Sequence, residues 1–230
     1  MDIILVPGLW LDASSWDPIA PVLESAGHTV HALTMPGVGA PASESGAIGL
    51  ADWVAAVVDE IDALASPVVL VGHSGGGNVV WGAADARPSR VARVVFVDSA
   101  PPPDGAEISE FPVVDGVIPF PGWDFFDEPD IADIDAATRR REEDRARSVP
   151  ARVPTDGISL RDDARFGVPV TVLSGQADAA EFDRTIAEWG SFATEWRAIG
   201  DREVVRLGTG HWPQFTRPRE LAEAIVAAVR

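Results

Sequence analysis

The five residues Gly72–Gly76, with the sequence Gly-His-Ser-Gly-Gly, constrain the fold of this chain more than any other feature. They follow an apolar run at 67–71 that is typical of a buried strand, and they precede a helix-like stretch at 78–84. Where a strand turns directly into a helix at Gly-x-Ser-x-Gly, the serine backbone is strained and the flanking positions have room only for glycine. We therefore predict a tight turn with Ser74 at its apex. The simpler alternative is a glycine-rich turn that binds a phosphate or has no chemical role.

The composition limits the size of the fold and the classes of partner. The chain has 230 residues, which fits one substantial domain, and 46% of them are hydrophobic. The formal net charge of −18 argues against nucleic acid and anionic membrane surfaces as partners. There is no cysteine, which excludes a disulfide, a thiolate nucleophile and a cysteine-based zinc site.

Targeting and membrane signals are missing from the sequence pattern. No apolar run reaches the ~18–20 residues that a membrane-spanning helix needs. Residues 3–6 begin a strand without a basic leader before them, so we expect no signal peptide and a cytoplasmic location.

Strand-like and helix-like segments alternate along the chain. We expect strands at the apolar, often β-branched runs 3–6, 28–33, 68–71, 91–97, 168–173 and 204–207. We expect helices at 15–26, at 50–65, directly after the serine turn and at 221–229. Continuous apolar strands separated by helices indicate an α/β fold, with a mostly parallel sheet that helices cover on both faces.

One long segment interrupts this alternation. After the strand at 91–97, Pro101–Pro103 begin a stretch rich in proline and aromatic residues, which an acidic and arginine-rich run at 133–147 follows. The insertion of about 65 residues is too long for a plain loop. We expect a single domain over 1–230, with a core of 1–100 and 168–230. Residues 101–167 are expected to form a small lid over the C-terminal edge of the sheet.

A serine hydroxyl becomes a useful nucleophile only with a base to take its proton and a group to orient that base. Open parallel sheets place such groups at the C-terminal ends of their strands. His211 follows the last strand in a glycine-rich turn, and it is the candidate base. His28 and His31 belong to an early strand, and the side chain of His73 should point away from Ser74.

Two aspartates compete for the role of the orienting acid. Asp178 follows the penultimate strand and precedes His211, which gives the chain order serine, aspartate, histidine, and we favour it. Asp98 ends the strand at 91–97 and is the alternative, since either strand end can reach the histidine.

Hydrolysis of an acyl group needs two backbone amides to hold the developing oxyanion. We expect them from Gly75, directly after the serine, and from Leu9, in the loop after the first strand. Trp10, Trp123 and Trp212 are candidate substrate-binding residues in an apolar or aromatic pocket, and packing within the core and lid is an equal alternative. No histidine and carboxylate cluster has metal-ligand spacing, so we expect no metal site.

Together these motifs resemble the α/β-hydrolase superfamily across essentially the whole chain. The first-strand motif Val6–Trp10, the serine turn, the turn at 175–178 and the segment 210–213 fall in that family's order. The direct start at the oxyanion strand is similar to the compact branch of plant methylesterases and hydroxynitrile lyases. The resemblance implies a cofactor-free hydrolase that uses an acyl-serine intermediate. A small-molecule carboxylic ester is the favoured substrate because its leaving group departs more easily, and the candidate tryptophan pocket suggests an ester of apolar or aromatic character.

The chain also departs from that pattern. Pro7 stands where the family usually has histidine, and the lysine that hydroxynitrile lyases place beside the catalytic histidine has no counterpart, because the chain contains no lysine. We therefore set the lyase activity aside. Hydrolysis of a lactone or of a carbon–carbon bond, and ligand binding without turnover, stay open as alternatives. The sequence indicates no oligomeric state.

Overall fold

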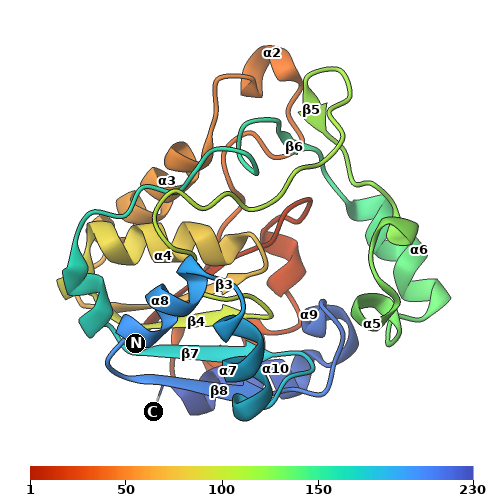
Figure 1. Cartoon of the computed structure of the whole chain (residues 1–230). Coiled ribbons are helices and arrows are strands. Elements are labelled where there is room, and N and C mark those ends of the chain that lie inside the picture. The colour runs from red at the N-terminus through yellow and green to blue at the C-terminus, as the bar shows by residue number, and fades with distance from the viewer. Residues whose placement is uncertain (230) are drawn as a thin grey trace.

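The structure, a computed structural model, describes residues 1–229 and is built around one six-stranded sheet (Figure 1). The strands are β1 (Asp2–Val6), β2 (Thr29–Ala32), β3 (Val68–His73), β4 (Val91–Val97), β7 (Val170–Ser174) and β8 (Arg202–Arg206). They lie in the order β2-β1-β3-β4-β7-β8, and every adjacent pair is parallel. The expected α/β fold with a parallel sheet is confirmed, and each predicted strand is present with boundaries that shift by a few residues.

Helices connect these strands and cover the sheet. Those of the core are α1 (Ala20–Ser25), α2 (Ala42–Ser45), α3 (Leu50–Ala63), α4 (Gly76–Ala86), α7 (Ala179–Ala187), α8 (Ser191–Ala198), α9 (Pro213–Thr216) and α10 (Pro218–Ala228), with 3₁₀ turns η1 (Ala13–Trp16) and η2 (Pro88–Arg90). The helix predicted at 15–26 is split into η1 and α1. Pro18 and Pro21 lie in this stretch and lack the amide hydrogens that one continuous helix would need. Among residues 1–229, no helix is long and apolar enough to cross a lipid bilayer.

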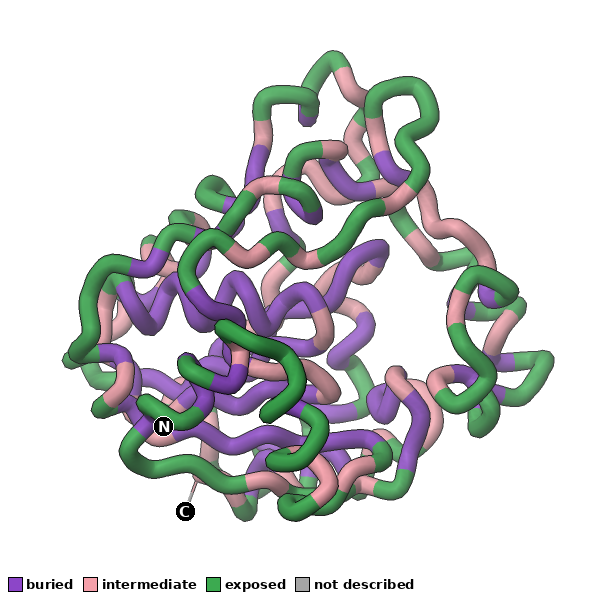
Figure 2. Tube along the Cα trace, viewed as in Figure 1, coloured by how far each residue is buried: buried purple, intermediate pink, exposed green. Residues whose placement is uncertain are grey.

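Two hydrophobic cores lie on opposite faces of the sheet, because successive side chains of a strand point to opposite sides. One core contains Ile4, Leu70 and Phe96 of the strands with Trp53 of α3 and Trp81 of α4. The other contains Ile3, Val69 and Val95 with Leu23 of α1 and Ile225 of α10. Figure 2 shows the central strands and α4 buried along nearly their whole length. The C-terminal strand ends are therefore held rigidly from both sides.

Residues 101–167 leave the end of β4 and return to the sheet before β7, and we call them the lid segment. They contain the antiparallel pair β5 (Val117–Ile118) and β6 (Val149–Pro150), with η3 (Trp123–Phe125), α5 (Glu128–Ile131), α6 (Ala136–Arg145) and η4 (Asp163–Gly167). In Figure 1, α5 and α6 lie on the side of the sheet where β8 leads into α9, and β5 lies next to α2. The lid segment thus approaches the edge at which the strands end.

Candidate active site

Ser74 lies at the apex of the turn between β3 and α4. Its φ is +52°, a left-handed conformation that is strained for a residue with a side chain. The glycines around it leave no space for a methyl group: a Cβ on Gly72 would lie 2.5 Å from the carbonyl oxygen of Gly76, and one on Gly76 would lie 2.6 Å from that of Pro7. The predicted strand–turn–helix geometry and its crowded glycines are therefore confirmed.

The hydroxyl of Ser74 lies within hydrogen-bonding distance of His211. The distance from Ser74 Oγ to His211 Nε2 is 2.9 Å, and His211 Nδ1 lies 2.7 Å from Asp98 Oδ2. A carboxylate can only accept a hydrogen bond, so Nδ1–H donates to Asp98 and leaves the lone pair of Nε2 to accept from the serine hydroxyl. This arrangement prepares His211 to remove the proton of Ser74.

Asp98 reaches His211 because it directly follows β4, the neighbour of β3. The two strands pair with His73 opposite Val97, so Ser74 and Asp98 are the next residues on adjacent strands. Like Ser74, Asp98 has a left-handed backbone, with φ of +46°. Burial alone would raise the pKa of this carboxyl group, but hydrogen bonds from His211 and from the Gly175 amide, at 2.7 Å, outweigh burial and hold the pKa below its ordinary value. Asp98 is thus kept ionised beside His211.

The prediction that Asp178 orients His211 is wrong in this structure. Asp178 is exposed and is the N-cap of α7, where its side chain accepts a hydrogen bond from the Glu181 amide at 2.9 Å. The Glu181 carboxylate returns a bond from the Asp178 amide at 3.0 Å, which completes a capping box. Residues 175–177 carry the chain past the end of β7 before Asp178, so its carboxylate serves the helix and Asp98 takes the position beside the histidine.

The amides expected to hold an oxyanion lie on two adjacent loops. Gly75 precedes α4, and Leu9 lies in the loop after β1; a Cβ on Gly75 would lie 3.3 Å from Leu9 Cγ, so the two residues are neighbours. Within residues 1–229, neither amide donates a hydrogen bond to another group of the chain. The loop is itself strained, since Trp10 has φ of +65°. Two amides without a partner in the chain, beside Ser74, are compatible with an oxyanion hole.

The three tryptophans predicted to bind substrate lie around one small space between the lid segment and the core. Trp10, Trp123 and Trp212 are at most 7% exposed. The rings of Trp123 and Trp212 are 5.1 Å apart, and Phe126 packs edge-on against both Trp10 and Trp212. They surround a cavity of only about 10 Å³. In this geometry they form a packed lid core, which fits the packing alternative better than an open pocket.

His211 is also held through its main chain. Its amide donates to the carbonyl oxygen of Asp130 in α5 at 2.8 Å, and its carbonyl accepts from Nε2 of His73 at 2.8 Å. Burial raises the pKa of the Asp130 carboxyl group, and the negative charges of Asp98 and Asp127 raise it further. The charge of His211 acts in the opposite direction but does not offset these effects. No sequence pattern predicts the contact between His211 and Asp130, because backbone atoms of two segments far apart in the chain form it.

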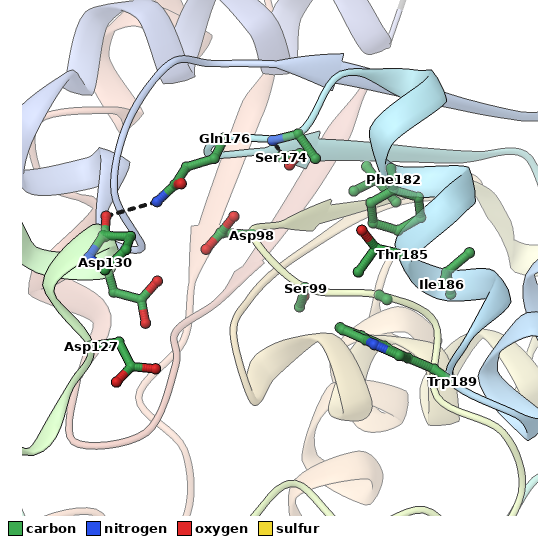
Figure 3. A pocket seen from close by; sticks show the side chains of 14 residues that line it. Asp98, Ser99, Asp127, Asp130, Ser174, Gln176, Phe182, Thr185, Ile186 and Trp189 are labelled. Atoms are coloured by element: carbon green, nitrogen blue, oxygen red, sulfur yellow. Dashed lines mark hydrogen bonds between the residues drawn. The ribbon is translucent and has the colours of Figure 1, made fainter.

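A larger cavity, of about 430 Å³, lies beside Asp98 (Figure 3). Asp127 and Asp130 of the lid segment lie on one side of it, and Phe182 and Trp189 lie on the other. Neither Ser74 nor His211 is among its lining residues. Among residues 1–229, no group of histidine, aspartate and glutamate side chains is placed to hold a metal ion.

Comparisons with known proteins agree with the fold. A model of the alpha/beta hydrolase family matches residues 3–224. An extracellular alpha/beta-hydrolase from a Paenibacillus species superposes with a TM-score of 0.79 at 24% identity, over 100% of this chain and 99% of the other. A methylesterase from Arabidopsis superposes with a TM-score of 0.76 at 18% identity, over 100% of this chain and 98% of the other.

Similar sequences include esterases from plants and bacteria. Esterase PIR7B from Oryza sativa subsp. japonica is 38% identical over 103 residues, which are 43% of this chain and 38% of that protein. A carbendazim hydrolyzing esterase from Nocardioides sp. (strain SG-4G) is 36% identical over 104 residues, which are 44% of this chain and 43% of that protein. The matches therefore span about two fifths of these relatives' length, and they support an esterase-like branch of the fold.

Proposed function

The chain belongs to the alpha/beta hydrolase family, and we propose that it is a cofactor-free serine esterase that cleaves a small carboxylic ester through an acyl-serine. The observation that carries this proposal is the continuous hydrogen-bonded chain from Ser74 through His211 to Asp98. Esterases among the similar sequences support the same reaction class.

In the proposed reaction, Ser74 Oγ attacks the ester carbonyl carbon while His211 Nε2 takes the hydroxyl proton. Asp98 stabilises the imidazolium that forms, and the amides of Leu9 and Gly75 donate to the oxyanion of the tetrahedral intermediate. The carbon–oxygen bond to the alcohol then breaks, and His211 returns its proton to the leaving alcohol. Water, deprotonated by His211, then attacks the acyl carbon. The bond from that carbon to Ser74 Oγ breaks, and His211 returns the proton to Oγ, which releases the acid and restores Ser74.

The surroundings of Gly75 favour a small, apolar acyl group. A Cβ on Gly75 would lie 3.1 Å from Ile108 Cγ2 of the lid segment and 3.3 Å from Leu9 Cγ. These two side chains border the proposed oxyanion site, and aliphatic side chains there leave an acyl substituent no polar partner. We therefore propose an ester with a short, uncharged acyl part as the substrate.

The test is the hydrolysis of p-nitrophenyl esters from acetate to decanoate by the wild type and by Ser74→Ala. We expect turnover that peaks at short chains and falls by about 10⁴-fold or more in Ser74→Ala. Ser43→Ala, a change at an exposed serine of α2, is the matched control and should leave turnover unchanged. Near-normal rates in Ser74→Ala would overturn the serine mechanism. A folded wild type that cleaves no ester would instead favour lactone or carbon–carbon bond hydrolysis, or ligand binding.

A further inference from the structure

We propose that His73, paired with Gln214, is a positioning residue that holds His211 in its productive place by binding the main chain of the base. The inference rests on the proposed role of His211 as the base for Ser74. His73 is the last residue of β3 and directly precedes Ser74. Its side chain reaches the loop after β8 that carries His211, and its Nε2 lies 2.8 Å from the carbonyl oxygen of His211. It thereby joins the strand that carries the nucleophile to the loop that carries the base.

The partners of the His73 ring determine its tautomer. The carbonyl oxygen of His211 can only accept, so Nε2 of His73 must carry a proton and donate it. Nδ1 lies 3.2 Å from Nε2 of the Gln214 side chain, an amide nitrogen that can only donate. A neutral ring with its proton on Nε2 satisfies both contacts, and neither the cation nor the other tautomer does.

Burial keeps the ring in that neutral state. His73 is 1% exposed, and burial together with the nearby His211 lowers its pKa to about 3. The ring is also enclosed sterically, since a Cβ on Gly8, in the loop after β1, would lie 2.7 Å from its Nδ1. Because the ring cannot titrate near neutral pH or rotate freely, the distance it sets to the His211 carbonyl is fixed.

With this contact, every polar atom of His211 has a hydrogen-bond partner outside the loop that carries it. The amide nitrogen bonds Asp130 of the lid segment, and the carbonyl oxygen bonds His73. The ring nitrogens bond Asp98 and Ser74. A ring in a turn after the last strand would otherwise move with that turn, and a displacement of about 1 Å between reacting groups can cost about 10²-fold in rate.

Two substitutions of His73 by amide side chains distinguish a role in positioning His211 from a role in packing alone. In His73→Gln the side-chain amide reaches the place of Nε2 and can still donate to the His211 carbonyl, whereas in His73→Asn the amide stops at the place of Nδ1. The readouts are kcat and KM with a p-nitrophenyl ester and the second-order rate at which a fluorophosphonate labels Ser74. Labelling needs the base but no ester turnover, so it remains measurable even if the proposed ester is the wrong substrate class.

We expect His73→Gln to keep labelling within about threefold of the wild type, and His73→Asn to lose about tenfold or more in labelling and in kcat while KM stays within about twofold. A smaller loss is expected in Gln214→Leu. Side-chain nitrogen NMR of the wild type should show His73 protonated on Nε2 alone. Equal labelling by the Gln and Asn variants at equal folded fraction, measured by near-UV circular dichroism, would overturn the inference, as would a proton on Nδ1. If the wild type itself is not labelled, the proposed serine mechanism fails, while the tautomer measurement still tests the hydrogen bonds of His73.

Discussion

Asp98 and His211 are joined by a hydrogen bond of 2.7 Å, and the second carboxylate oxygen of Asp98 is bound by the amide of Gly175. One oxygen therefore orients the ring of His211 while the other fixes the carboxylate to the neighbouring loop. The side chains of Asp98 and His211 are 23% and 22% exposed, so this pair is accessible from solvent without being freely hydrated.

Asp98→Asn is expected to lower kcat by about 10³–10⁴-fold with little change in stability, because an amide can present its NH₂ to Nδ1 and favour the wrong tautomer of His211. Asp178→Asn is the matched control, since asparagine is as good an N-cap as aspartate and the residue lies outside the site. Ester turnover by both variants is the measurement. A large loss in Asp178→Asn with little loss in Asp98→Asn would contradict the assignment of the acid.

Sequence patterns predicted most of the candidate site, but they favoured Asp178 over Asp98 as the carboxylate beside His211, and the reason is geometric. The contact between Ser74 and His211 and the closeness of Leu9 to Gly75 could be predicted because each residue lies in a local motif with its own glycines. The chain-order rule is met by both Asp98 and Asp178, so order alone could not separate them. The feature that distinguishes the two aspartates is the pairing of β3 with β4, which places Asp98 beside Ser74.

Other features of the structure were not predicted from the sequence. The left-handed backbone of Asp98 depends on tertiary contacts. The helices α7 and α8, between the last two strands, were not predicted, although α7 carries a capping box at its start. The packing of Trp123 against Trp212, and of Phe126 against Trp10 and Trp212, depends on the path of the lid segment, which periodicity does not describe.

Gly72→Ala is expected to destabilise the protein by about 3 kcal/mol, since the new methyl group would meet the Gly76 carbonyl oxygen at 2.5 Å and backbone atoms cannot move aside cheaply. Gly200→Ala is the control, because the new methyl group would have its nearest contact at 3.6 Å, with the Phe166 carbonyl oxygen. This substitution should change the free energy of unfolding by about 0.5 kcal/mol or less. Urea unfolding of both variants measures the difference. Similar midpoints for the two would show that the turn is not crowded.

Ile108→Ala is expected to move the optimum of the ester series toward longer acyl chains. Ile108 Cγ2 borders the space beside Gly75, and removing three carbons there should raise kcat/KM for longer esters by about tenfold, as expected for relief of a crowded pocket. Val113→Ala changes an aliphatic residue of the same lid segment that is 56% exposed, and it should leave the profile unchanged. An unaltered chain-length profile in Ile108→Ala would place the acyl group elsewhere.

The depressed pKa of His73 predicts how stability depends on pH. In the folded protein its pKa is about 3, against 6.5 for an unperturbed histidine, so between these values the unfolded chain binds a proton that the folded chain does not. The free energy of unfolding is therefore not reduced by this residue above pH 6.5. It falls as the pH decreases from 6.5 toward 3, by up to about 1.4 kcal/mol per pH unit, because protonation of His73 stabilises the unfolded chain.

His73→Gln removes the titrating group while keeping the donor, so its stability should fall less steeply with acid. Urea unfolding at pH 7.5, 6 and 5 is the measurement, with the slope against pH compared between the two proteins so that a constant offset does not matter. Burial also lowers the pKa of His28, but that residue is present in both proteins and cancels in the comparison. We expect the wild type to lose about 2 kcal/mol more than the variant between pH 7.5 and 5. Parallel slopes would mean that His73 becomes protonated in the folded state, and its bond from Gln214 would then have to break.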